Sequence, residues 1–239
     1  MKMNPKNQSF DTKQVSNINI MLHLSIKTEK ILPYLPKRMK SFEVGKSTSM
    51  FVLGICRFVD NNFATTESCY ELFFGVLVYQ DATFNFEDET SPGLYVINLT
   101  SDSENFLEFM YDHYKMPVFK SSELKVKLQY PTNVEIKDGY GPIVTIRNIG
   151  LEPVFQMQNK ELYCYASPDK NGNVYYAKAR IQGNFCMHQE KGNWGELYEH
   201  PFFLGLDVKS LKENDLKMQS FLKQEELATT LVDQSEKLL

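Results

Sequence analysis

Several features that would point directly to a function are missing from this chain of 239 residues. The longest apolar runs, such as Met50–Cys56 and Leu72–Tyr79, are only strand-length, so no membrane span is predicted. The net charge is −4 and no basic stripe is visible, which argues against a nucleic-acid partner. The first ten residues lack the apolar core of a secretory signal, so we expect a cytoplasmic protein.

Cysteine and histidine are too few and too scattered for a metal site. Cys56, Cys69, Cys164 and Cys186 do not have the spacing of metal ligands, and the four histidines are dispersed. We therefore expect four reduced thiols rather than a disulfide framework, no structural metal and no cofactor.

The sequence motifs of common enzyme classes are also absent, including GxSxG, GxGxxG and GxxxxGK[ST]. The most pointed local feature is Glu71, which heads an apolar strand that continues through Leu72, Phe73 and Phe74. Burial in such surroundings would raise the pKa of the carboxyl and suit it to proton transfer. The alternative, which composition alone favours, is a glutamate at an exposed strand end that water satisfies.

The middle of the chain predicts a strand, a capped helix, a proline turn and a second strand. Leu94–Leu99 is apolar and strand-length, and Ser103–Tyr114 has apolar residues on one helical face. Ser101 or Asp102 is expected to cap the helix, and Pro117 follows its end. The turn after this helix is where we expect side chains to face a binding site.

The rest of the chain predicts many short strands with marked turns. The segment Val15–Ile26 alternates as a strand does, Glu29–Tyr34 suits a short helix, and Asp138–Gly141 marks a hairpin. We predict an α+β, β-rich single domain with few helices, whose sheet is closed or nearly closed.

Three segments are expected along the chain: a loose arm over residues 1–16, the domain over 17–206 and a helical tail over 207–239. The tail prediction rests on a stretch without Gly or Pro after Gly205. In that stretch Leu211, Leu216 and Phe221 mark an apolar side that a helix could bury.

Six motifs in order carry a resemblance to a known family. They are ILPYLP, CYELFFGVLV, GLYVINLTSDSENFLEFMYDHYKMP, NGNVYYAKARIQG, GNWGELYEHPFF and GLDVKSL. From about Asn17 to Leu206 the sequence resembles the acetoacetate decarboxylase-like family. The resemblance implies a twisted β-cone or barrel around one pocket, in which a lysine attacks a β-keto acid to form a Schiff base and carbon dioxide leaves.

The chain departs from the family at the residues that carry this chemistry. Where the resemblance implies two adjacent lysines after Pro117, this sequence has Val118 and Phe119. The family's arginine on the first strand has no clear counterpart, and its glutamate within Phe51–Phe58 is missing, so Glu71 is the implied pocket group that remains. The standard Schiff-base decarboxylation is therefore predicted to be absent.

Two functions from different classes stay open. Glu71 could act as acid or base on a small carbonyl or carboxylate compound without a Schiff base. Alternatively, the pocket could hold a small apolar ligand without catalysis. A displaced lysine, Lys120 or Lys115, is a further variant of the enzyme hypothesis. A lipocalin-like barrel is an alternative hypothesis outside the family.

The candidate site residues are Glu71 and Lys120 as catalytic groups, with Tyr70, Tyr95, Met116, Val118 and Phe119 contacting the ligand. The expected partners are a small molecule and a second copy of the chain.

Overall fold

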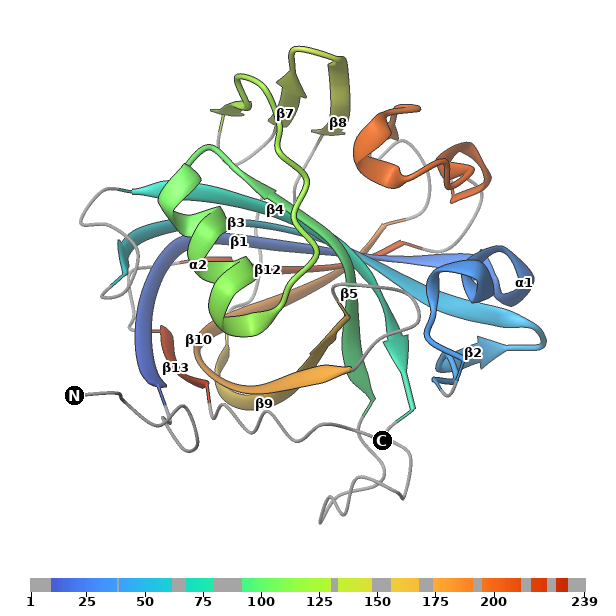
Figure 1. Ribbon diagram of the computed structural model, residues 1–239, viewed down its shortest axis with the longest axis horizontal. Coiled ribbons are helices and arrows are strands. Elements are labelled where there is room, and N and C mark those ends of the chain that lie inside the picture. The colour runs from blue at the N-terminus through green and yellow to red at the C-terminus, as the bar shows by residue number, and fades with distance from the viewer. Residues whose placement is uncertain are drawn as a thin grey trace.

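The computed structural model describes residues 10–37, 39–61, 68–79, 92–129, 133–147, 156–167, 174–190, 195–211, 216–222 and 227–231. Within these residues the strands form two sheets (Figure 1). The larger sheet has the order β13-β1-β12-β10-β9-β5-β4-β3-β2, and the smaller has the order β11-β8-β7-β6. Strands thus dominate and helices are few, which confirms the β-rich α+β fold class.

The strands of the larger sheet are β1 (Phe10–Lys27), β2 (Glu43–Gly45), β3 (Thr48–Asn61), β4 (Cys69–Val78), β5 (Gly93–Ser101), β9 (Gln156–Ala166), β10 (Tyr175–Glu190), β12 (Leu216–Leu222) and β13 (Leu227–Leu231). Those of the smaller sheet are β6 (Lys125–Gln129), β7 (Asn133–Asp138), β8 (Gly141–Arg147) and β11 (Gly195–Leu197). The helical elements are α1 (Thr28–Ile31), η1 (Leu32–Tyr34), α2 (Glu104–Tyr114), η3 (Pro201–Phe203) and η4 (Val208–Leu211). No helix among these described elements is both long and apolar enough to cross a bilayer.

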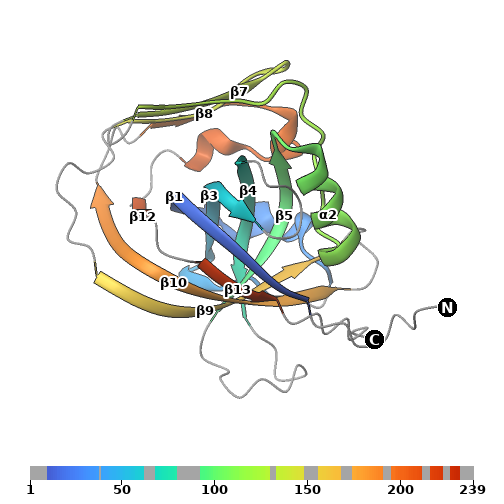
Figure 2. The same ribbon diagram turned by 90° about the vertical axis from the view of Figure 1, so that its left-hand side faces the viewer.

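The first strand closes the larger sheet on itself, because β1 pairs with β3 on one side and with β12 on the other. The same residues of β1, Ile18–His23, take part in both pairings. β12 pairs in turn with β10, and the circuit continues through β9, β5 and β4 back to β3. Figure 2 shows β9 and β10 curving beneath β1, β3, β4 and β5. The circuit therefore has an inner and an outer face.

Side-chain alternation assigns residues to these two faces. On β4, Phe73 packs in one cluster with Met21 of β1, Ala177 of β10 and the buried side of α2. Since strands from opposite parts of the circuit meet in this cluster, it is the inner face. The next residue, Phe74, packs in a second cluster with β7, β8, η3 and α1, which cover the outer face. In Figure 2 the orange η3–η4 segment lies between the β7–β8 pair and the larger sheet.

Helix α2 follows the sequence prediction closely, although its cap is a different residue. Ser103 is the N-cap, and its Oγ accepts from the backbone N–H of Phe106. Ser101, one of the two residues expected to cap the helix, instead accepts from the N–H of Ser103. The helix ends at Tyr114, and Lys115 adopts a left-handed conformation with φ 54° that reverses the chain. The cap and this reversal together fix where the residues after α2 lie.

The structure differs from the expectations for both ends of the chain. Strand β1 begins at Phe10, so the segment expected as a loose arm already contributes to the sheet. After Leu206 the described residues form η4 and the strands β12 and β13 instead of a helical tail. A stretch without Gly or Pro suits either structure, and the free edges of β1 and β10 decide in favour of strands. The side chains of β12 and β13 and residues 232–239 lie outside the description.

Because β12 lies between β1 and β10, we predict that truncation after Leu211 destabilises the fold strongly. Removing this strand breaks two ladders of backbone hydrogen bonds, each bond contributing about 1 kcal/mol net. The expected loss of several kcal/mol lowers the melting temperature by roughly 10 °C or more. Thermal unfolding measured by circular dichroism tests this. Truncation after Leu231, which keeps β12 and β13, is the control and should melt like the full chain. Equal melting of the two truncated proteins would contradict the closure.

Candidate functional site

Glu71 lies on the inner face of the strand circuit. It pairs directly with Cys56 of β3 and with Ser101 of β5, so the three side chains point to the same face of the sheet. Only 7% of Glu71 is exposed, although it stands near the start of β4. Of the two alternatives that the sequence allowed for Glu71, the buried one is therefore observed, and the exposed strand end is wrong.

Burial raises the pKa of the Glu71 carboxyl from its ordinary value of 4.5 to about 8, and a hydrogen bond with the Cys56 thiol lowers it only in part. No cation among the described residues contributes to this balance. At neutral pH the carboxyl is therefore mostly protonated and uncharged. In that form it can donate a hydrogen bond or a proton to a neighbouring oxygen.

Three cysteine thiols surround this carboxyl. The pKa values of Cys69 and Cys164 are raised to about 12, first by burial; the proximity of Glu71 contributes to both, after that of Asp102 for Cys69. Cys56 is also raised well above its ordinary value, first by burial and then by Glu71. A thiol must lose its proton to act as a nucleophile or a metal ligand. The three thiols are thus free, as the sequence predicts, and none of them is activated beside Glu71.

Two further polar residues on the inner face were not recognised from the sequence. Asn19 of β1 pairs with Cys56, and His23 of β1 pairs with Val52, which belongs to the inner cluster. Although it alternates with the apolar residues of β1, His23 is half-buried. Alternation along β1 was the available signal. It failed because both faces of a strand in a closed circuit are covered.

The residues after α2 divide between the two faces. Phe119 donates its N–H to the carbonyl of Leu99, and Leu99 donates its N–H to the carbonyl of Pro117. These two bonds form a short parallel bridge between Leu99 and Val118. Met116 and Val118 pack in the inner cluster, on the face of Glu71. Phe119 packs against the outer core instead.

The structure does not bring all the predicted site residues together. Tyr95 pairs with Val76 and is buried in the outer core, so the prediction that Glu71 shares a pocket with Tyr95 and Phe119 is wrong. Tyr70, next to Glu71, points to the other face, and the Arg57 guanidinium lies over its ring. Of the predicted ligand-contacting residues, only Met116 and Val118 share the inner face with Glu71.

Neither candidate lysine lies beside Glu71. Lys120 is exposed, two residues beyond Val118. Lys115 donates to the carbonyl of Asp112 at the end of α2. No lysine whose side chain the structure describes is buried. The inner position where the resemblance implies a lysine is therefore occupied by the isopropyl group of Val118.

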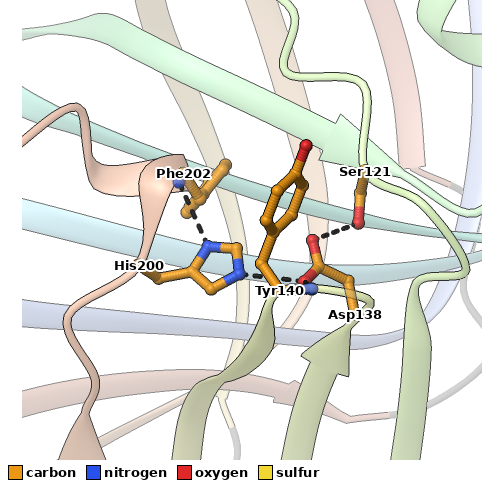
Figure 3. Close-up of polar contacts among 5 residues, drawn as sticks. All are labelled: Ser121, Asp138, Tyr140, His200 and Phe202. Carbon is orange, nitrogen blue, oxygen red and sulfur yellow. Dashed lines mark hydrogen bonds and ion pairs between the residues drawn. The ribbon is translucent and has the colours of Figure 1, made fainter.

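A second buried polar cluster lies on the outer side of the circuit (Figure 3). The Asp138 carboxylate accepts from Ser121 Oγ at 2.6 Å, from the Tyr140 N–H at 2.7 Å and from His200 Nε2 at 2.9 Å. The backbone N–H of Phe202 donates to His200 Nδ1 at 3.1 Å. His200 is therefore a neutral tautomer that carries its proton on Nε2, because Nδ1 is already an acceptor.

This cluster joins the chain segments that cover the outer face. Burial alone would raise the pKa of Asp138, but the bonds from Ser121, Tyr140 and His200 outweigh it and lower the pKa. Since every partner is a donor to a fully buried carboxylate, the cluster resembles a structural clamp more than a catalytic triad. Ser121 bonds to the carboxylate rather than to His200, so the cluster does not have the serine–histidine hydrogen bond of a catalytic triad.

The described residues contain no group of three or more His, Cys, Asp or Glu side chains arranged to hold a metal ion. Glu71 and its three thiol neighbours do not form such a group. At this inner face the Glu71 carboxyl can offer hydrogen bonding and proton transfer.

Comparison with solved structures shows what the fold is similar to. Over 96% of this chain and 93% of the other, the structure resembles an acetoacetate decarboxylase from Legionella pneumophila, with a TM-score of 0.55 and 13% identity. It also resembles the enduracididine biosynthesis enzyme MppR in complex with pyruvate, with a TM-score of 0.52, 8% identity and 90% of each chain covered. A second acetoacetate decarboxylase structure is similar with a TM-score of 0.50 and 12% identity, over 91% of this chain and 90% of the other.

No protein-family model matches the sequence, and no curated protein matches it either. The chain thus has the acetoacetate decarboxylase-like fold that its motifs suggested, at identities that establish the fold alone.

We predict that Glu71 makes stability fall as pH rises. Between pH 4.5 and about 8 the unfolded chain releases this proton while the folded chain keeps it. The free energy of unfolding should therefore decrease across this window, by an amount on the order of a few kcal/mol, and become independent of Glu71 above it. Urea denaturation of Glu71→Gln from pH 5 to 9 tests this, because the variant should lack the decrease. The exposed Glu135→Gln is the matched control and should keep it. Identical pH profiles for all three proteins would refute the raised pKa.

For the outer cluster we predict that His200→Ala destabilises the protein by about 2–4 kcal/mol. The substitution removes a donor to buried Asp138 and leaves the Phe202 N–H without its acceptor. Denaturant unfolding measures the change. The control is Lys209→Ala, which removes an exposed ion pair with Glu199 and should leave the unfolding midpoint nearly unchanged. Similar midpoints for the two variants would contradict a structural role of the clamp.

Proposed function

We propose that this protein binds a small carbonyl or carboxylate compound at the inner face of its strand circuit, with Glu71 as the proton donor. The observation that carries the proposal is the buried Glu71 carboxyl, which is held uncharged at neutral pH by its surroundings. An acid whose pKa lies near the working pH is protonated in a large fraction of molecules and is still acidic enough to transfer its proton. A carbonyl oxygen is the natural acceptor for such a donor.

The proposal does not involve a lysine Schiff base. That intermediate needs a neutral amine within bonding distance of the substrate carbon. Val118 occupies the inner position after α2, and Lys120 is exposed. The decarboxylase variant with a displaced Lys120 is therefore the weakest form of the enzyme hypothesis. The similar fold of MppR, which was solved with pyruvate, supports a keto-acid-like ligand class for a scaffold of this kind.

A non-catalytic binder of a small apolar molecule is the second candidate. It is favoured by the apolar side chains of Met116 and Val118, which share the inner face with Glu71. An apolar ligand would gain from burial alone and would not depend on the protonation of Glu71. Dependence on pH therefore distinguishes the two candidates.

We predict that acetoacetate and pyruvate bind to the protein and that their affinity falls as pH rises through about 8. Above this pH Glu71 is charged, so it loses its donor and repels a carboxylate. The other titratable side chains described on the inner face are His23, Cys56, Cys69, Cys164 and Tyr114. Titration followed by ligand-observed NMR at pH 6 and 9 tests this, with Glu71→Gln expected to lose the pH dependence and Glu135→Gln to keep it.

The same samples also test the absence of a Schiff base. After incubation with acetoacetate and borohydride, mass spectrometry should find no reduced adduct. A stoichiometric adduct on Lys120 or Lys115 with release of carbon dioxide would overturn this part of the proposal. Binding that is equal at pH 6 and pH 9 would favour the apolar binder instead. Consumption of a bound compound, followed by NMR, separates an enzyme from a binder.

A further inference from the structure

Asn19 of β1 is a buried polar residue on the inner face. It is only 3% exposed, and its Oδ1 has no hydrogen-bond partner in the described part of the chain. An amide oxygen buried without a partner costs free energy. Such a cost in a central strand needs an explanation other than packing, because an apolar residue of similar size would avoid it.

A second buried asparagine shows how the fold treats a structural one. Asn98 of β5 faces the outer side and donates from Nδ2 to the carbonyl of Phe202 at 2.8 Å. Its Oδ1 accepts from the backbone N–H of Leu99 at 3.1 Å. Both ends of this amide are bonded, and it links β5 to η3. Among the described residues, Asn19 Oδ1 has no comparable link, so it is not explained as a structural residue of this kind.

The strand register aims Asn19 at the candidate site. Asn19 pairs directly with Cys56, which pairs directly with Glu71 on the next strand. Directly paired residues point to the same face, so Asn19 and Glu71 flank Cys56 on the inner face of three neighbouring strands. Their Cα atoms are two strand spacings apart, roughly 10 Å, with Cys56 on the strand between them.

We propose that Asn19 and Glu71 together bind one small uncharged molecule that carries both a carbonyl oxygen and an N–H or O–H group, such as a primary amide or an α-hydroxyketone. Glu71 donates to the carbonyl oxygen, and Asn19 Oδ1 accepts from the N–H or O–H. This inference rests on the proposed function and ranks its ligand class: uncharged compounds that carry both groups are expected to bind more tightly than carboxylates such as acetoacetate and pyruvate.

No cation among the described side chains affects Glu71, which favours an uncharged ligand. An anion would need a cation or several donors to replace its hydration. None of the lysine or arginine side chains described by the structure is buried on this face, and the half-buried Arg57 points to the other side of β3. The neighbouring thiols stay protonated. A neutral donor and a neutral acceptor match a molecule with one group of each kind.

The test compares four probes by ligand-observed NMR at pH 6.5: propanamide, hydroxyacetone, acetone and propanoate. Acetone has a carbonyl oxygen but no donor for Asn19, and propanoate is charged. For the wild-type protein we expect propanamide and hydroxyacetone to bind at least tenfold more tightly than acetone or propanoate. Because this comparison uses the unaltered protein, it does not depend on the folding of any variant.

Asn19→Leu keeps the size of the side chain and removes its polar atoms. We expect this substitution to weaken the binding of propanamide at least tenfold and to leave the affinity for acetone unchanged. The matched control is Thr100→Val. Its hydroxyl is also buried and unpartnered among the described residues, but Thr100 pairs with Leu72 on the outer face. This control should bind all four probes as the wild type does.

Each remaining outcome is decisive. If Glu71→Gln weakens propanamide but Asn19→Leu does not, the role of Asn19 is refuted while the proposed function stands. If acetoacetate binds but neither propanamide nor hydroxyacetone does, the uncharged ligand class is refuted. If no compound binds the wild type, or if neither substitution changes any binding, both this inference and the proposed function fail.

Discussion

The double pairing of β1, with β3 on one edge and β12 on the other, is the constraint on which the rest of the structure depends. It converts an open sheet into a circuit and gives the strands an inner face that the opposite strands and α2 cover. The odd-numbered side chains of β4 consequently lose their hydration. The raised pKa of Glu71 follows from that loss and not from a charged neighbour, so the chemistry of the site originates in the closure of the sheet.

The bridge between Leu99 and Val118 determines what the inner face contains besides Glu71. It sets the register of the segment after α2, so that Val118 faces inward and Phe119 faces outward. A shift of one residue would exchange these two side chains between the faces. The helix cap at Ser103 and the left-handed Lys115 hold the register, because they fix the length and the end of α2. Local helix signals thus control the content of a site that is built from distant strands.

Much of the fold could be predicted from the sequence, because α2, β4 and the β7–β8 hairpin carry strong local patterns. The burial of Glu71 was also within reach, since apolar residues follow it on β4. The sequence did not allow us to predict which face of the sheet Tyr95 and Asn19 point to, because this depends on which strands pair and in which register. A bulge between Phe74 and Gly75 shifts the register with β5, and no local pattern marks it. Similarly, the residues of β12 become a strand because two partner edges are free, which a single sequence does not reveal.

The neutral carboxyl of Glu71 also limits which reactions this interior can assist. Loss of carbon dioxide from a β-keto acid leaves an electron pair that a neighbouring group must accept. An iminium ion on a lysine accepts it readily, whereas a carbonyl that is only hydrogen-bonded to a neutral acid is a weaker acceptor. Removal of a proton would need a base, and burial keeps Cys56, Cys69 and Cys164 protonated. For the proposed function, the surroundings of Glu71 therefore favour recognition and polarisation of a carbonyl group over proton abstraction or Schiff-base decarboxylation.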